Sequence, residues 1–140
     1  MAIPTPGSFN MQPEAYRYIQ EQERQLAAAK ASAAAISGQT YFISVPISYA
    51  ENKDYPIIQN APFAMTIDSI TTKAESGTCT LTGKINTTAL GGTANAVSSS
   101  EDIQAHTSAN AVAVGDDFKL TVSANAFCVG VIATIAYRRA

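Results

Sequence analysis

The hydrophobic period of the chain changes at Gly38, and this change limits what the sequence can fold into. Residues 13–36 contain no glycine, and helix formers such as Ala, Gln, Glu, Leu and Lys dominate them. Beyond residue 40, apolar residues recur at every second position, which is typical of β-strands. The sequence therefore predicts an extended arm and one α-helix within residues 1–38, followed by a β domain over residues 39–140.

The predicted helix carries a thin heptad pattern along one side. Apolar and small residues repeat seven apart, with a second set offset by four, over about three heptads. The seam consists of Ala15, Ile19, Gln22, Leu26, Ala29, Ala33 and Ile36. Because most of these side chains are small or polar, one such helix buries little area and needs neighbours. We expect these residues to form the interface of a homotrimer; a single helix lying on the β domain is the alternative.

The first β-rich runs contain two irregular positions. TYFISVPISYA is interrupted by Pro46, which indicates an edge strand or a bulge. ENKDYP is expected to be a loop. In AMTIDSITTKA the apolar phase shifts between Ile67 and Ile70, so we expect a bulge near Asp68.

Two later strands alternate clearly. In SGTCTLTGKI, Cys79, Leu81 and Ile85 share one face, while threonines and a lysine share the other. In FKLTVSA, we expect one face to be buried and the other exposed. The inward residues are Phe118, Leu120 and Val122, and the outward residues are Lys119, Thr121 and Ser123.

The last strand, AFCVGVIATIAY, is the most apolar. We expect one shared phase for Phe127, Val129, Val131, Ile135 and Tyr137, with Cys128 out of that phase. Ile132 adds apolar surface to the other face, so the strand is expected to be central or to meet another subunit. The stretch NTTALGGTANAVSSS, which directly follows SGTCTLTGKI, is expected to be mostly loop.

About seven or eight short strands, with turn signals between them, favour a mainly β protein. Short connections favour antiparallel pairing. The predicted fold is a jelly-roll-like antiparallel β-sandwich preceded by an extended arm and one α-helix.

Composition excludes several classes of partner. Charged residues make up 14% of the chain and the net charge is −2. No basic cluster is longer than Arg138-Arg139, so we expect no nucleic-acid partner. No apolar run is long enough for a transmembrane helix, so we expect no membrane partner. MAIPTPGSFN lacks the features of a signal peptide, so we expect none.

Few residues suggest chemistry. His106 is the single histidine and is expected to be packed or solvated rather than to act as a ligand or base. Cys79 and Cys128 are expected to be free, with one of them buried. Asp116-Asp117 is better explained by a turn after Gly115 than by a calcium site. Adjacent Glu101 and Asp102 would point to opposite faces of a strand, unlike a catalytic pair of carboxylates. We therefore expect no catalytic, metal or cofactor site, and no enzyme.

The segments TIDSITTKAESGTCTLTGKINTTAL and TSANAVAVGDDFKLTVSA, with an apolar final strand, resemble small β-sandwich virion proteins of tailed bacteriophages. These include head-decoration or cement proteins, head fibres and spikes. The resemblance covers residues 64–137 and implies jelly-roll trimers displayed on a capsid or tail.

On this basis we expect a structural protein of a phage particle. It would bind the major capsid protein as a trimer on the virion surface, after synthesis in the host cytoplasm. The apolar and proline residues of the arm are the expected capsid contacts: Met1, Ile3, Pro4, Pro6 and Phe9. The alternative is the receptor- or glycan-binding tip of a tail fibre or spike, for which the stretch from Asn86 to Ser100 is the candidate surface.

Overall fold

The computed structural model describes residues 20–26 and 38–140. The chain divides into two compact units, Met1–Ser37 and Gly38–Ala140. In the first unit, residues 20–26 form a helix whose side chains are all exposed. This segment confirms helix within the predicted range; the rest of that range lies outside the described residues.

The second unit is an antiparallel sheet of nine strands, which confirms the mainly β prediction. The longer strands are β1 (Thr40–Tyr49), β2 (Asp54–Ile58), β3 (Met65–Lys73), β4 (Ser76–Ile85) and β9 (Phe118–Arg139). The shorter ones are β5 (Thr88–Ala89), β6 (Asn95–Val97), β7 (Asp102–Ala105) and β8 (Ala111–Val112). The detailed connectivity of a jelly roll stays a prediction.

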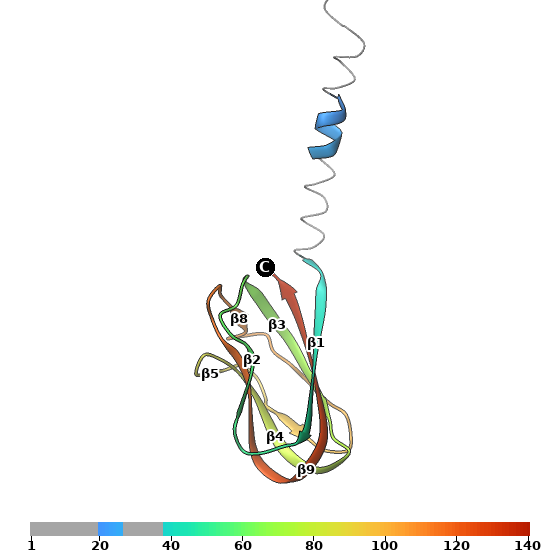
Figure 1. Ribbon diagram of the computed structural model, residues 1–140, viewed down its shortest axis with the longest axis vertical. Coiled ribbons are helices and arrows are strands. Elements are labelled where there is room, and N and C mark those ends of the chain that lie inside the picture. Colours follow the sequence, from blue (N-terminus) through green and yellow to red (C-terminus); the bar gives the residue numbers. More distant parts are fainter. Residues whose placement is uncertain (1–19, 27–37) are drawn as a thin grey trace, which may run out of the picture. The chain divides into compact units, whose positions relative to one another are not determined.

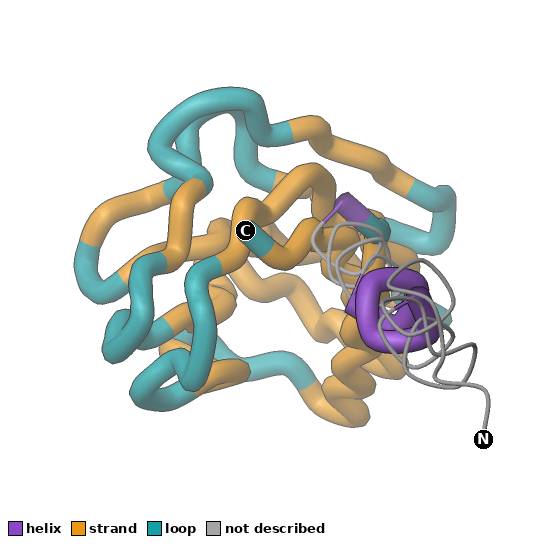
Figure 2. The backbone as a smooth tube through the Cα atoms, turned by 90° about the horizontal axis from the view of Figure 1, so that it is seen from above, coloured by secondary structure: helices purple, strands orange, loops and turns teal. Residues whose placement is uncertain are grey.

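Strand β9 organises the whole sheet because it has different neighbours along its length. Residues 118–123, here called its first half, pair with β2 and β4. Residues 131–139, its second half, pair with β1 on one side and β3 on the other. Figure 1 shows this long strand bending at the end of the domain opposite the C-terminus. Figure 2 shows the domain from above, with loops joining the strands.

The bend of β9, residues 124–130, depends on left-handed backbone. Ala124, Phe127 and Gly130 have φ values of 50°, 51° and 67°. Gly77, in the facing part of β4, has φ 76°, and a Cβ there would lie 2.0 Å from the Phe127 carbonyl oxygen. Only glycine permits this approach, so Gly77 allows β4 to continue past the bend.

The core fills the space between the two halves of β9. Side chains from both halves are fully buried, including Phe118 and Leu120 from the first half and Ile135 from the second. Ile67 and Ile70 of β3 and Leu81 of β4 join them. Burying each such side chain stabilises the fold by about 1.5–3 kcal/mol, so the core holds the curled sheet together.

Four local predictions are confirmed. The pairing of β3 with β9 shifts between Ile67 and Ser69, which is the bulge expected near Asp68. Pro46 lies on β1, which pairs only with β9 among the described strands and is therefore an edge strand. The alternation of β4 and of residues 118–123 is as expected, with the apolar residues buried. The last strand is central, as its apolar character predicted.

Three local predictions are wrong. ENKDYP is not all loop, because Asp54, Tyr55 and Pro56 belong to β2, an edge strand whose register shifts after Pro56. The two runs FKLTVSA and AFCVGVIATIAY form one bent strand rather than two. Within that strand Phe127 is 92% exposed and Cys128 is 1% exposed, the reverse of the expected phase. The left-handed residues at 124 and 127 interrupt the alternation and turn Cys128 inward.

Candidate functional site

The outward side chains of β1, the second half of β9, β3 and β7 form one surface, here called the apolar face. Residues that pair across these strands form rows, and the side chains of three such rows point away from the core. The rows consist of Phe42, Ala136, Ser69 and Ala105; of Ser44, Thr134, Thr71 and Ile103; and of Pro46, Ile132 and Lys73.

Large apolar side chains are exposed on this face. Phe42 is 69% exposed, Ile103 60% and Ile132 55%. Serine and threonine separate them, with one hydroxyl contact of 3.3 Å between Ser44 and Thr134. This arrangement has the apolar centre that is typical of protein contact surfaces.

Charges lie at the two ends of the apolar face. At one end the Arg138 Nε donates to both carboxylate oxygens of Asp68, at 3.1 and 2.9 Å. Through this hydrogen bond and its negative charge, Asp68 raises the pKa of the Arg138 guanidinium above its ordinary value. At the other end lie Lys73 and Glu75. The face therefore also has the charged rim of a contact surface.

The outward side chains of β2, the first half of β9 and β4 form a second surface, here called the polar face. It includes Thr80, Thr82 and Lys84 of β4, and Lys119 and Thr121 of β9. Thr121 Oγ1 donates to Asp54 Oδ1 at 2.6 Å, and Lys119 Nζ lies 3.3 Å from Asp54 Oδ2. The Thr121 hydrogen bond, followed by Lys119, lowers the pKa of Asp54.

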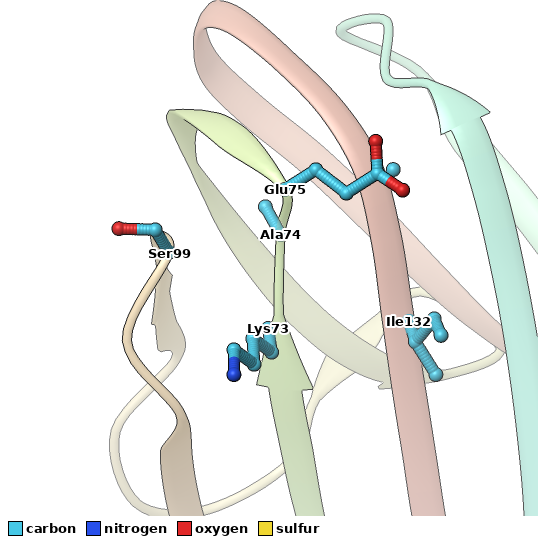
Figure 3. Close-up of a pocket in the computed structure, with 6 residues that line it drawn as sticks. Lys73, Ala74, Glu75, Ser99 and Ile132 are labelled. Carbon is cyan, nitrogen blue, oxygen red and sulfur yellow. The ribbon is translucent and has the colours of Figure 1, made fainter.

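A groove crosses the end of the apolar face where Glu75 lies over β9 (Figure 3). One hollow of about 290 Å³ is lined by residues including Lys73, Ser99 and Ile132. Another, of about 180 Å³, includes Pro46 and Ser48, and the two hollows share Glu75, Gly130 and Ile132. A Cβ at Gly130 would lie 2.6 Å from the Glu75 side chain, so glycine makes room for this crossing.

The bend of β9 presents a second exposed feature. Phe127 is 92% exposed and Tyr49 is 77% exposed at the same end of the domain, since Tyr49 pairs with Val129. Hydrogen bonds fix the backbone there: Cys128 N donates to Asn125 Oδ1 at 3.1 Å, and Asn125 Nδ2 donates to Ala50 O at 2.7 Å. A left-handed phenylalanine costs on the order of 1–3 kcal/mol, so these bonds hold the ring outward against strain.

Buried polar groups elsewhere have structural roles. His106 is packed, as one of the two expected environments, and its Nδ1 lies 2.7 Å from the Gly91 carbonyl oxygen. Because a carbonyl only accepts, Nδ1 carries the hydrogen. Asn95 Nδ2 donates to Ile70 O at 2.9 Å and to Asp102 Oδ2 at 3.1 Å. His106 thus joins two loops, and Asn95 joins β6 to β3 and β7.

The aspartates after Gly115 form the predicted turn. Asp116 Oδ2 accepts from Ala113 N at 3.0 Å, and Asp117 Oδ1 accepts from Asn60 N at 2.8 Å. The Ala113 hydrogen bond, followed by one from Asn86, lowers the pKa of Asp116. Both carboxylates are thus used in joining neighbouring loops.

Most predicted contact residues lie outside the described residues. These are the capsid contacts Met1, Ile3, Pro4, Pro6 and Phe9, and the seam residues Ala15, Ile19, Ala29, Ala33 and Ile36. Gln22 and Leu26 are described; both are exposed, and Leu26 is 57% exposed.

Sequence reasoning placed Ile132 on the other face of the last strand, where it is exposed, but missed the rest of the apolar face and the exposed Phe127. Phe42 could have been found because it stands out of phase with the buried residues of its strand. Phe127 could not, because only the bend turns it outward.

Within residues 20–26 and 38–140, no group of three or more His, Cys, Asp or Glu side chains could hold a metal ion. Over the same residues, no helix is long and apolar enough to cross a membrane.

Comparison with models of known protein families gives no match to this chain, and comparison with curated proteins gives none either.

Proposed function

We propose that this chain is a structural protein of a bacteriophage particle. It binds the major capsid protein as a homotrimer, and it decorates or cements the capsid on the virion surface. The proposal combines the resemblance of residues 64–137 to small virion proteins with the surface chemistry of the β domain.

The apolar face is the observation that carries the proposal. Phe42, Ile103 and Ile132 are each more than half exposed on one side of the sheet. Such exposure is unfavourable for a free domain and favours association, because covering the face removes apolar surface from water. The face surrounds these residues with hydroxyls and limits its charges to the ends, which suits a tightly packed protein contact.

The edge strand β1 adds a second means of association. It is ten residues long and pairs only with β9 among the described strands. Its other edge therefore offers backbone N–H and C=O groups to a neighbouring chain. Pro46 in this strand cannot donate a backbone hydrogen bond, which limits pairing at that position.

The exposed helix supports the trimer part of the proposal. Leu26 belongs to the predicted heptad seam and is 57% exposed. Gln22 precedes it by four positions, so both lie on one side of the helix. In a trimer, copies of this side would cover Leu26, while Gln22 would favour a single register.

Light scattering tests the oligomer. A homotrimer should give three times the chain mass of 14.7 kDa. A monomer that persists at high protein concentration would exclude the trimer.

Particle binding tests the capsid part. Purified protein should bind particles that lack it, at an occupancy measured by mass spectrometry; hundreds of copies per particle indicate decoration. Deleting residues 2–12 should leave a folded trimer that no longer binds, because the arm holds the predicted capsid contacts. Unchanged occupancy after the deletion would assign the contact to the β domain.

The bend of β9 favours a second candidate function, a receptor- or glycan-binding tip. Phe127 and Tyr49 present exposed rings at the end of the domain opposite its C-terminus. A few to tens of copies per particle, with loss of cell or glycan binding in Phe127→Ala, would support this function instead of decoration.

A further inference from the structure

Two cysteines that the proposed function does not use lie together beneath the bend of β9. Cys79 of β4 is 5% exposed and Cys128 of β9 is 1% exposed. Their Sγ atoms are 3.5 Å apart, although the residues are 49 positions apart in the sequence. Both are free thiols.

The bend of β9 brings the two cysteines together. Pairing between β4 and β9 is irregular between Ser76 and Thr80, so simple register does not set Cys79 opposite Cys128. The left-handed Phe127 instead turns Cys128 inward, and the Asn125 side chain fixes the Cys128 backbone N–H at 3.1 Å. The two sulfur atoms therefore lie together because of the left-handed backbone and the Asn125 hydrogen bond at the bend.

The separation is short enough for a cross-link. A disulfide has its sulfur atoms about 2.05 Å apart, so the two thiols must approach by roughly 1.5 Å.

We propose that Cys79 and Cys128 form an oxidisable pair, which a small-molecule disulfide converts into an intramolecular disulfide between β4 and the bend of β9. The proposal goes beyond the proposed function and does not depend on it. It describes a modification site in which a cross-link would fasten the bend once the protein meets oxidising surroundings.

The exchange balances as two successive displacements. A thiolate of the pair attacks one sulfur of the oxidant; a mixed disulfide forms, the oxidant's S–S bond breaks, and one thiolate leaves. The second protein thiolate then attacks the protein sulfur of the mixed disulfide and releases the other half of the oxidant. Two protein thiols are oxidised, the oxidant is reduced to two thiols, and the protein's two protons pass to them.

Burial sets the rate of this reaction. Desolvation, followed by the hydrogen bond with Cys128, raises the pKa of Cys79 to about 12. The thiolate is therefore scarce in the closed protein, and exchange requires the bend to open. We expect slow oxidation that accelerates in denaturant concentrations too low to unfold the protein.

The test uses the full chain and oxidised glutathione. After prolonged incubation, free thiols should fall from two to none, the chain should lose two hydrogen atoms by mass spectrometry, and no larger species should appear on non-reducing gels. The melting temperature should rise by about 10 °C, because the cross-link closes a long loop. Dithiothreitol should return both thiols and the original melting temperature.

Two single-cysteine variants and reduction by dithiothreitol are the controls. Cys79→Ala and Cys128→Ala each retain one thiol, so neither should show the rise in melting temperature. Since each could also disturb the core, the dithiothreitol reversal in the unmodified chain is the primary control. Thiols that survive incubation, cross-links between chains, or a disulfide that leaves the melting temperature unchanged would each overturn the proposal.

Discussion

The two halves of β9 carry similar cores but different surfaces. Beneath the first half lie Phe118 and Leu120, and beneath the second lie Val131 and Ile135, all buried. Outside, the first half presents Lys119 and Thr121, whereas the second presents Ile132 and neighbours such as Phe42. One strand thus serves a solvated surface and an apolar surface in turn.

The two faces differ in whether their outward side chains have partners within the domain. On the polar face, Asp54 accepts a hydrogen bond from Thr121 and forms an ion pair with Lys119. On the apolar face, Phe42, Ile103 and Ile132 have no such arrangement. Threonine suits an exposed strand because its branched Cβ fits the pleat while its hydroxyl meets solvent. A large exposed apolar group gains only when something covers it.

The largest effect is expected at the bend that separates the two faces. In Gly77→Ala, the new Cβ would meet the Phe127 carbonyl at 2.0 Å, on backbone with φ 76°. We expect a loss of about 3 kcal/mol or more in the free energy of unfolding, from left-handed strain and displacement of the bend. Urea denaturation measures it. Gly38→Ala is the control, since nothing lies within 4 Å of a Cβ there; equal losses in both variants would contradict this account of the bend.

Core truncation under each face should follow in size. Leu120→Ala should cost about 2–4 kcal/mol and Val131→Ala about 1–3 kcal/mol, from lost burial and the cavity left behind. Lys119→Ala and Thr121→Ala, on the same strand but outward, should stay within about 0.5 kcal/mol. Chemical denaturation of all four variants compares them, and similar losses in the inward and outward pairs would mean that the strand phase is misassigned.

Substitutions on the two faces should differ in their effect on trimer content and capsid binding, although neither should change the melting temperature much. The double variant Phe42→Ser and Ile132→Ser should leave the melting temperature nearly unchanged, because both side chains are exposed. It should lower trimer content or capsid binding at least about tenfold, as loss of central contacts does. Thr80→Ser with Thr82→Ser, on the polar face, is the matched control. Analytical ultracentrifugation and particle binding measure both, and wild-type behaviour of the apolar-face variant would remove that face from the interface.

The smallest effect is expected at acid pH on the polar face. The pKa of Asp54 is lowered from its ordinary value of 3.8, so the folded state favours the charged carboxylate. Its contribution to stability is present above that ordinary value and is lost as pH falls through the lower, folded value. The melting temperature of the wild type should therefore approach that of Asp54→Asn between about pH 5 and pH 2. A difference that stays constant over this range would rule out Asp54 as the titrating group.

Local sequence was sufficient for several features. Alternation in β4 predicted the buried Cys79, Leu81 and Ile85, because side chains of a strand point to opposite faces in turn. The phase change after Ile67 predicted the β3 bulge. Pro46 predicted an edge strand or a bulge, and β1 is an edge strand. These predictions succeeded because each depends on residues that are neighbours in the chain.

The candidate surfaces could not be predicted without the order of the strands in the sheet. Exposed Ile103 could be paired with Thr71 only after β7 was found beside β3. The environment of His106 depended on the Gly91 carbonyl, fifteen positions away. Such contacts follow from strand order, which local periodicity does not contain.

Side-chain type and period were enough to predict the change from helix to strand, the buried residues of the regular strands and the low charge of the surface. Contacts between distant parts of the chain set three further features: residues 118–139 form one strand with a bend, Phe127 points outward and Cys128 lies beside Cys79. These features depend on the conformation of the backbone. Left-handed conformations at Ala124 and Phe127 are unfavourable locally, and contacts from the loop after β1 and from β4 hold them in place.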